Sequence, residues 1–313
     1  MAKILVTGVN GFVGHHLVRE LKSQGFSVVG AGREPEVSVE IKELLEQYFV
    51  CELTEKADVQ KLPLGEIAGI INLAGLAAVG PSFDNPDLYM RINTAVLSVI
   101  CEEILARGLE SNIRIVAVSS GAVYDSNQQM PLTEISKVNP SSSPYTASKL
   151  AMEDVAKDYR SKGLDCIVAR PLNHIGPGQG EGFLLPDLYA KISSSIASGQ
   201  PLRVGKLTTK RDYTDVRDVT KAYVALMMAD NLVSTTYNIC SGVARSGEEV
   251  LGALKSALEQ PNVETIVDES LFRPSDAPEL YGSNERINKE TGWKPMIPFG
   301  KTVQDFVAWK KLS

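Results

Sequence analysis

The sequence has few of the residues that build metal sites and disulfide frameworks. Among its 313 residues are only three histidines and four cysteines. The histidines do not have the spacing of metal ligands, and no C-x-x-C motif occurs. The cysteines lie far apart in apolar surroundings, at Cys51, Cys101, Cys166 and Cys240. We therefore expect buried free thiols and no metal site.

The chain also lacks an excess of positive charge and a long apolar run. Its formal net charge is -6, which argues against broad nucleic-acid binding, because that requires a basic surface. No apolar run is long enough to span a bilayer, and the run at residues 3–7 is too short for a signal peptide. We expect a cytoplasmic protein with no nucleic-acid or membrane partner.

Short β-rich runs alternate with helical patterns over roughly the first 170 residues. Most of the runs are almost continuously apolar, as strands covered on both faces should be. This alternation predicts βαβ units and an α/β fold with a doubly wound parallel sheet. The expected strands are residues 3–7, 27–31, 48–52, 69–73, 114–119 and 165–170. The expected helices are residues 12–24, 87–106 and 145–161.

A glycine-rich loop at residues 7–14 follows the first expected strand and opens the first expected helix. Gly8 permits the tight turn, Gly11 lets the backbone approach a pyrophosphate, and Gly14 allows close packing of helix on strand. The free N–H groups of the helix N-terminus would face the phosphates. The spacing G-x-x-G-x-x-G is not the commonest one, but its setting predicts a Rossmann dinucleotide site.

The character of the sequence changes after Pro171. Glycine and proline mark a loop at 176–182. Helices near 186–198 and 216–228 and a short strand near 201–204 are expected beyond it. We predict a dinucleotide-binding domain at 1–172 and a smaller C-terminal α/β substrate domain at 173–313. A segment near 212–242 should partly return to the first domain, with a strand at 236–239 joining its sheet.

The end of the second expected strand bears on the choice between NAD and NADP. Arg33 could pair with the 2′-phosphate of NADP, whereas Glu34 could bind the free ribose hydroxyl of NAD and repel that phosphate. Because Arg33 comes first after the strand, we favour NADP(H) over NAD(H).

Tyr145 and Lys149 are four residues apart in an expected helix, so their side chains lie on one face. The positive charge favours the phenolate, which makes the phenolic proton easier to move. Ser119 and Ser120 end the fifth expected strand, at the edge of the sheet where ligands bind. Together with the glycine loop, this pattern indicates an enzyme that moves a hydride and a proton at a carbonyl group.

In this order, the motifs resemble the extended short-chain dehydrogenase/reductase family, over essentially the whole chain. The resemblance implies that Ser120 hydrogen-bonds the carbonyl oxygen and that Tyr145 moves the proton. It implies that Lys149 holds the nicotinamide ribose and lowers the pKa of the tyrosine. It also implies cofactor contacts from Gly8, Asn10, Gly11, Phe12, Val13, Gly14, Arg33, Glu52, Leu53, Leu73, Ala74, Gly75, Asn93, Val118, Tyr145, Lys149, Pro171 and His174.

Gly121 and Ala122 stand where sugar-nucleotide 4,6-dehydratases of this family carry an acidic pair. Without that acid and base, removal of water across C5 and C6 is not expected. Segments of the second half are similar to signatures shared by GDP-mannose dehydratases and GDP-4-keto-6-deoxy-D-mannose reductases. These segments are residues 170–179, 210–218, 238–242, 273–276 and 282–295. The best similarity is to reductases that make GDP-D-rhamnose.

The resemblance also implies a set of substrate contacts, in which arginine provides the planar fork that a diphosphate requires. For Lys191 the alternative of a plain surface lysine stays open. The set is Ser120, Asn173, Lys191, Arg211, Arg273 and Asp276.

The sequence thus predicts NADP(H)-dependent reduction of the 4-keto group of a nucleotide-linked 6-deoxyhexose, in particular GDP-4-keto-6-deoxy-D-mannose to GDP-D-rhamnose. One alternative is an NAD-dependent nucleotide-sugar 4-epimerase, which would recycle a bound cofactor. Another is a non-catalytic NADP(H) sensor, although such a chain would be expected to lose the tyrosine or the lysine. The resemblance further implies a homodimer formed through residues 87–106 and 145–161.

Overall fold

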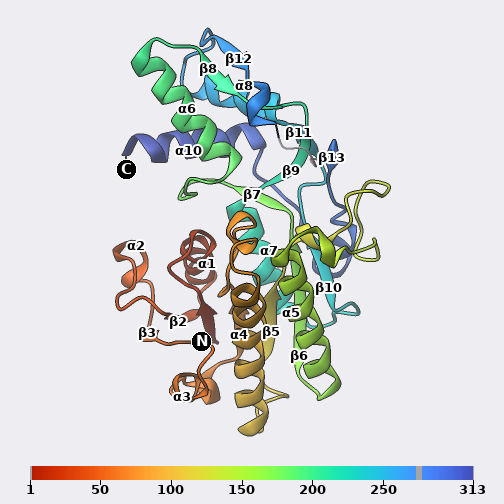
Figure 1. Ribbon diagram of the computed structural model, residues 1–313. Helices are drawn as coiled ribbons and strands as arrows, with labels where there is room; N and C mark the ends of the chain where they lie inside the picture. Colours follow the sequence, from red (N-terminus) through yellow and green to blue (C-terminus); the bar gives the residue numbers. More distant parts are fainter. Residues whose placement is uncertain (1, 273–276, 313) are drawn as a thin grey trace.

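The protein consists of a larger lobe built around a sheet and a smaller lobe at its edge (Figure 1). The structure, a computed structural model, describes residues 2–272 and 277–312. The smaller lobe contains the helices α6 (Leu184–Ser198), α8 (Gly247–Ala257) and α10 (Phe299–Leu312). The chain passes between the lobes several times, so the predicted division at residue 172 remains a prediction.

A seven-stranded parallel sheet forms the centre of the larger lobe, in the order β3-β2-β1-β4-β5-β6-β10. The strand order reverses beside β1, where doubly wound sheets bind ligands. The predicted sheet is confirmed, and the strand expected at 236–239 does pair with β6. The strands are β1 (Lys3–Thr7), β2 (Ser27–Gly32), β3 (Gln47–Val50), β4 (Gly69–Asn72), β5 (Arg114–Val118), β6 (Asp165–Pro171) and β10 (Thr236–Ile239).

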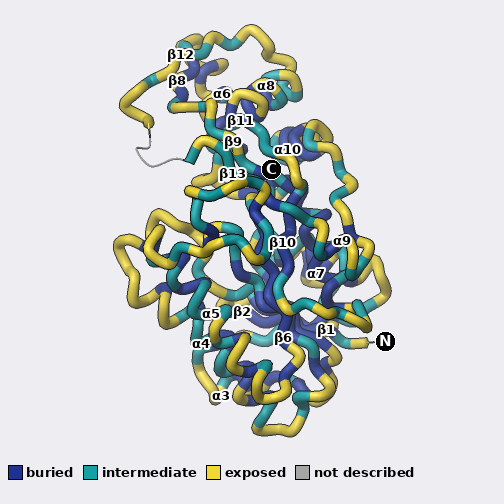
Figure 2. The backbone as a smooth tube through the Cα atoms, turned by 90° about the vertical axis from the view of Figure 1, so that its right-hand side faces the viewer, coloured by how far each residue is buried: buried dark blue, intermediate teal, exposed yellow. Residues whose placement is uncertain are grey.

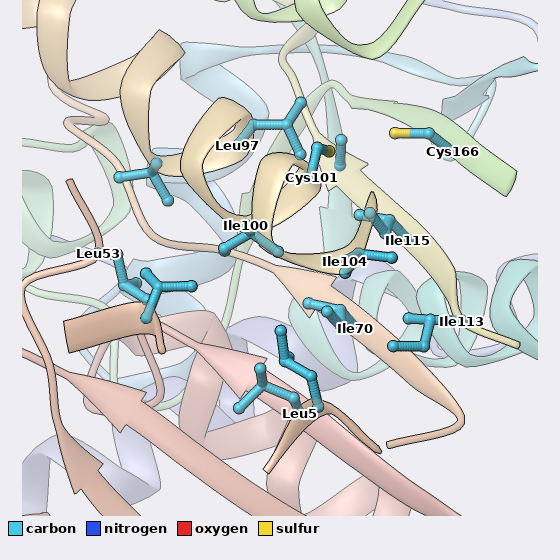
Figure 3. Close-up of a cluster of buried hydrophobic side chains, with 14 of the residues drawn as sticks. Leu5, Leu53, Ile70, Leu97, Ile100, Cys101, Ile104, Ile113, Ile115 and Cys166 are labelled. Carbon is cyan, nitrogen blue, oxygen red and sulfur yellow. The ribbon is translucent and has the colours of Figure 1, made fainter. Parts of the chain in front are cut away.

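Helices cover both faces of this sheet, as strands that are apolar on both sides require. On one face, α4 (Pro86–Ala106) and α5 (Pro144–Ser161) pack against each other and against the strands. On the other face lie α1 (Phe12–Ser23), α7 (Val216–Met228) and α9 (Glu285–Thr291). Figure 3 shows part of the first core, with Leu97, Ile100 and Ile104 of α4 near Leu5, Ile70 and Ile115 of the strands.

Short helical segments occupy several connections of the chain. They are α2 (Val39–Lys42), α3 (Lys56–Val59), η1 (Leu64–Glu66), η2 (Gly80–Ser82), η3 (Gly121–Val123), η4 (Pro140–Ser142) and η5 (Glu269–Leu271).

Two small sheets support the smaller lobe. One contains β7 (Asn173–Ile175), β9 (Lys210–Asp215), β11 (Ala244–Ser246) and β13 (Glu279–Leu280), and β8 (Leu202–Val204) pairs with β12 (Thr265–Val267) in the other. The side chains of α6, α8 and α10 form a separate core. The sequence analysis missed the first of these sheets because its strands are short and rich in polar residues.

Buried residues concentrate along the central sheet and the helices beside it (Figure 2). All four cysteines are buried and free, as predicted. In the part of the chain that the structure describes, no helix has the length and apolar character needed to cross a membrane.

Candidate active site

The glycine loop makes a tight connection between β1 and α1. Gly8 has a φ of +66°, and a Cβ there would lie 3.0 Å from the backbone nitrogen of Ala74. A Cβ on Gly14 would lie 2.3 Å from the carbonyl oxygen of Val9, so only glycine allows this approach. Gly11 precedes α1, and no side chain of the described residues caps that helix. The loop therefore offers backbone N–H groups to an anion.

A large cavity of about 940 Å³ lies at the carboxyl ends of the sheet strands, between the two lobes. It is lined by every residue assigned above to the cofactor except Asn93. Ser120, Asn173 and Arg211 of the proposed substrate contacts also line it. The structure thus brings most of the predicted site residues together along one cavity, and their roles remain predictions.

Asn93 lies behind the cavity wall and holds the loop after β4, which forms part of that wall. Its side-chain oxygen accepts a hydrogen bond from the Leu76 nitrogen at 2.8 Å. Its amide nitrogen donates to Ser148 Oγ at 2.8 Å and to the Leu76 carbonyl oxygen at 3.2 Å. A Cβ on Gly75 would lie 2.7 Å from Asn93 Oδ1, so the glycine lets this loop lie against α4. The contacts give Asn93 a positioning role for the loop that follows β4.

Tyr145 and Lys149 come from the first two turns of α5, whose N-terminus is capped by Ser143. The Ser143 side chain accepts from the Thr146 nitrogen at 3.1 Å. Both site residues are almost completely buried, with exposed fractions of 6% and 8%. Lys149 Nζ donates to the carbonyl oxygen of Val118, the last residue of β5, at 3.0 Å. The ammonium is therefore fixed beside the end of the central sheet.

Ser120 follows β5 and begins η3. Its Oγ accepts a hydrogen bond from the Ala122 nitrogen at 3.1 Å, which leaves the hydroxyl hydrogen available to another acceptor. Burial raises the pKa of Tyr145 more strongly than a hydrogen bond from Ser120 lowers it. Tyr145 is thus protonated at neutral pH. The predicted lowering of its pKa by Lys149 stays a prediction.

Burial also perturbs the titration of Lys149. It lowers the pKa of this ammonium to about 8, while the nearby Glu153 carboxylate raises it. Glu153 lies one turn further along α5 and accepts hydrogen bonds from Ser119 Oγ at 2.6 Å and from Arg170 Nε at 2.8 Å. The sequence analysis missed Glu153, although its spacing of four residues from Lys149 repeats the spacing between Tyr145 and Lys149.

Arg33 and Glu34 lie at the other end of the cavity, directly after β2, and both are exposed. Glu34 Oε2 is 3.5 Å from Asn10 Nδ2 and would lie 2.8 Å from a Cβ on Gly32. The carboxylate is thus folded back over the end of the strand. Both the cation and the anion that the sequence analysis weighed are present at this end.

The segment after β6 closes the cavity against α1. The rings of His174 and Phe12 stack with centroids 6.0 Å apart and an interplanar angle of 17°. His16 lies 2.7 Å, measured from Nε2, from the carbonyl oxygen of Pro177. Burial lowers the pKa of His174, which keeps this imidazole neutral and suits a packing role better than that of a base.

Only some of the predicted substrate contacts line the cavity, whereas almost all of the predicted cofactor contacts do. Asn173 on β7 is exposed and lines the cavity. Arg211 on β9 is half-buried, and its Nη1 donates to the carbonyl oxygens of Lys210 at 2.7 Å and Ala277 at 2.9 Å. Lys191 is exposed on α6 and is not among the described residues that line the cavity. Arg273 and Asp276 lie outside the described residues.

Two further residues of the cavity wall, Gln179 and Tyr223, were not predicted. Both are buried. Tyr223 lies in a helix whose apolar pattern indicates core packing, and Gln179 ends the segment 170–179, whose similarity to the family signatures assigned no role to it. No sequence signal distinguished either of them from a structural residue.

The residues present fit a nicotinamide dinucleotide. The glycine loop supplies a cradle that a Cβ would fill, and the Tyr223 hydroxyl is a buried polar group with no partner among residues 2–272 and 277–312. The volume of about 940 Å³ lies within the range typical of ligand sites.

Comparisons with known proteins agree with this arrangement. Residues 5–306 match the family model described as GDP-mannose 4,6 dehydratase. The chain is 30% identical over 308 residues to GDP-6-deoxy-D-mannose reductase of Pseudomonas aeruginosa, covering 96% of this chain and 95% of the relative. It is 28% identical over 344 residues to UDP-glucose 4-epimerase of Pisum sativum, covering 99% and 95%.

The fold is also similar to the solved structure of RMD from Pseudomonas aeruginosa complexed with NADPH. The TM-score is 0.85 and the sequence identity 27%, with the whole of both chains covered.

Proposed function

The chain belongs to the GDP-mannose 4,6-dehydratase family of the epimerase and dehydratase type of short-chain dehydrogenase/reductases, and from this membership we propose that it is an NADP(H)-dependent nucleotide-sugar 4-ketoreductase. The preferred reaction is the reduction of GDP-4-keto-6-deoxy-D-mannose to GDP-D-rhamnose. The observation that carries the proposal is the meeting of Ser120, Tyr145 and Lys149 in one cavity with the glycine loop.

Ser120 and Tyr145 would act on the oxygen of the 4-keto group. The Ser120 oxygen accepts from the Ala122 nitrogen, so the Ser120 hydroxyl is a donor, and it would donate to the keto oxygen in place of Tyr145 when substrate binds. Tyr145 holds its proton at neutral pH because burial raises its pKa. A protonated phenol is the form that a reduction needs, since the oxygen gains a proton as C4 gains a hydride.

The dinucleotide, when bound, supplies the hydride that adds to C4. Lys149 would hold the ribose next to the nicotinamide and stabilise the phenolate that Tyr145 becomes after it gives up its proton. Arg211 and Asn173 would hold the diphosphate, so that one face of the sugar ring meets the reacting groups.

Gly121 and Ala122 support a reductase rather than a dehydratase. Both residues line the cavity beside Ser120, where neither can supply or accept a proton from a side chain. Removal of water across C5 and C6 needs both an acid and a base at the sugar. Besides the hydride that the dinucleotide supplies, reduction of a ketone needs only the single proton that Tyr145 provides.

For the cofactor we propose a preference for NADP(H), with Arg33 as the partner of the 2′-phosphate. The resemblance in fold to an NADPH complex supports this preference. Glu34 lies next to Arg33 and is held back toward Asn10. A preference for NADP(H) requires that this carboxylate stays away from the phosphate, because two anions in contact repel each other.

The test mixes purified protein with GDP-4-keto-6-deoxy-D-mannose and either NADPH or NADH. We expect oxidation of NADPH, in step with formation of a reduced sugar nucleotide identified by NMR, and slower oxidation of NADH. No oxidation of either dinucleotide at micromolar protein would defeat the proposal. Faster turnover with NADH would reverse the cofactor assignment alone.

A nucleotide-sugar 4-epimerase that depends on NAD is the second candidate, supported by the similarity to UDP-glucose 4-epimerases. It would use the same three residues but retain its dinucleotide. Dinucleotide that stays with the protein through purification, together with interconversion of UDP-glucose and UDP-galactose without net redox, would favour it.

We also propose a cytoplasmic homodimer. The four free thiols are consistent with a reducing compartment. The outward positions of α4 include the small, half-buried residues Ala95 and Ser98, which permit close approach of another helix. Sedimentation at micromolar concentration should give twice the mass of one chain, and a monomer would contradict the dimer without touching the reaction.

A further inference from the structure

Few buried side-chain atoms lack a hydrogen-bond partner within residues 2–272 and 277–312, and two of them belong to residues of the cavity wall. They are Gln179 Oε1 and the hydroxyl of Tyr223. Tyr223 is fully buried, with an exposed fraction of 0%. A buried hydroxyl without a partner costs free energy that a phenylalanine at the same place would avoid. Buried polar groups in native proteins are normally hydrogen-bonded. A ligand bound in the cavity would supply the partner that the Tyr223 hydroxyl lacks.

Tyr223 lines the same cavity as Tyr145 and Lys149. It projects from α7, on the opposite face of the sheet from α5. Burial raises the pKa of Tyr223, and a charge on the nearby Tyr145 raises it further, so Tyr223 is a neutral phenol and a hydrogen-bond donor. The partner of the Tyr223 hydroxyl must therefore be a hydrogen-bond acceptor close to the place where the hydride would be transferred.

We propose that the Tyr223 hydroxyl donates a hydrogen bond to the carboxamide oxygen of the nicotinamide ring in the bound dinucleotide. The inference rests on the proposed function, because it needs a nicotinamide at this end of the cavity. The carboxamide oxygen is the acceptor that the nicotinamide ring itself carries. Tyr223 is then a binding residue that fixes the orientation of the ring, contributed by a helix that carries no other predicted site residue.

The first experiment compares Tyr223→Phe with the natural protein. Dissociation constants for NADPH are measured by calorimetry, and thermal unfolding is followed without and with the dinucleotide. We expect binding to weaken about fivefold to tenfold, which corresponds to one net hydrogen bond. The melting temperature without dinucleotide should stay the same or rise, because the substitution removes an unpaired buried hydroxyl.

Tyr237→Phe is the matched control. Tyr237 is also fully buried, but its hydroxyl donates to the Ser234 carbonyl oxygen at 2.7 Å and lies 2.6 Å from Glu290 Oε2. Its removal should lower the melting temperature and leave the dissociation constant for NADPH unchanged. Tyr223→Phe should therefore weaken NADPH binding without lowering the melting temperature, and Tyr237→Phe should do the reverse.

A second ligand locates the contact on the dinucleotide. The fragment 2′-phospho-ADP-ribose has the adenosine and diphosphate portions of NADPH but no nicotinamide. Tyr223→Phe should bind this fragment as tightly as the natural protein does. A loss of affinity for the fragment equal to that for NADPH would move the contact away from the carboxamide and overturn the inference.

Two other results would also overturn it. If Tyr223→Phe binds NADPH with unchanged affinity, the hydroxyl does not contact the dinucleotide. If the variant loses thermal stability without the dinucleotide, as Tyr237→Phe does, an ordered water completes the hydroxyl in the free protein. Failure of the natural protein to bind any dinucleotide is a different result, which would refute the proposed function itself.

Discussion

The two ends of the cavity are built from different kinds of sequence. At the reacting end, Tyr145 and Lys149 lie one turn apart on α5, and Ser120 directly follows a buried strand. At the end proposed for the sugar nucleotide, Asn173 and Arg211 come from short strands almost forty residues apart in the chain. The one-turn spacing on a helix determines how Tyr145 and Lys149 lie relative to each other. The second set depends on how the smaller lobe packs on the larger one.

The difference also appears in burial. Tyr145 and Lys149 have exposed fractions of 6% and 8%, whereas Asn173 is exposed and Arg211 is half-buried. Burial perturbs the pKa of both residues at the reacting end, which is how proteins prepare groups for proton transfer. Under the proposed function, Asn173 and Arg211 at the other end hold the diphosphate and take no part in proton transfer. A change at the reacting end should therefore affect turnover, and a change at the other end should affect binding.

The largest effect is expected from Tyr145→Phe, which removes the proton donor and leaves the ring in place. Turnover should fall by about 10²–10⁴-fold, the range of general acid catalysis. The dissociation constant for NADPH should change by less than about threefold, because the proposed partner of the Tyr145 hydroxyl is the 4-keto oxygen of the sugar and not the dinucleotide. Steady-state kinetics and calorimetry measure the two effects. Turnover within a factor of about five of the natural protein would remove Tyr145 from the proposed proton transfer.

A smaller effect is expected from Gly14→Ala in the dinucleotide cradle. The new Cβ would lie 2.3 Å from the Val9 carbonyl oxygen, so the loop and α1 must move apart. We expect a loss of about 1–3 kcal/mol in the free energy of unfolding, as overpacking usually costs. NADPH should bind at least about tenfold more weakly, because the displaced loop carries the phosphate-binding N–H groups. Urea unfolding and calorimetry provide the measurements.

Gly252→Ala is the matched control for that substitution. Gly252 lies inside α8, and a Cβ there meets nothing within 4 Å. Alanine should stabilise the helix by up to about 1 kcal/mol and leave NADPH binding unchanged. Equal effects from the two alanines would show that the close approach at Gly14 does not matter.

Much of the reacting end could be predicted because short-range rules determine it. A strand, a glycine loop and a helix fix the cradle, and the spacing of Tyr145 and Lys149 puts both on one helical face. That the Tyr223 hydroxyl has no partner among the described residues could not be predicted, because it arises from packing of α7 beneath the sheet. Nor could the backbone contacts of Arg211, since β9 and Ala277 meet only in the folded chain.

The pH dependence of the reaction should report the burial of Lys149. Burial lowers the pKa of its ammonium to about 8, so the charge is present below that pH and is lost above it. Without the charge, the phenolate of Tyr145 is less stable and proton transfer slows. We expect kcat/KM for NADPH to be constant just below pH 8 and to fall about tenfold per unit well above it.

Lys149→Met tests the origin of that decline. The variant has no titrating amine at this position, so its residual activity should show no decline that begins near pH 8. A decline that persists in the variant would assign the titration to another group. A natural profile that stays level to pH 10 would mean that Lys149 keeps the pKa of an exposed lysine.

The smallest effects are expected at the sugar-nucleotide end, where two cations can be compared directly. Arg211→Ala should raise KM for the nucleotide sugar by about tenfold with kcat nearly unchanged, because a charge-assisted hydrogen bond to the diphosphate is lost. Lys191→Ala should change KM by less than about twofold, because Lys191 is exposed on α6 outside the cavity wall. If Lys191→Ala raises KM as much as Arg211→Ala, then α6 takes part in holding the diphosphate. The contrast between the reacting end and a binding end that depends on lobe packing would become sharper still, because the Lys191 side chain would have to reach into the cavity from a helix that lines it only at Leu184.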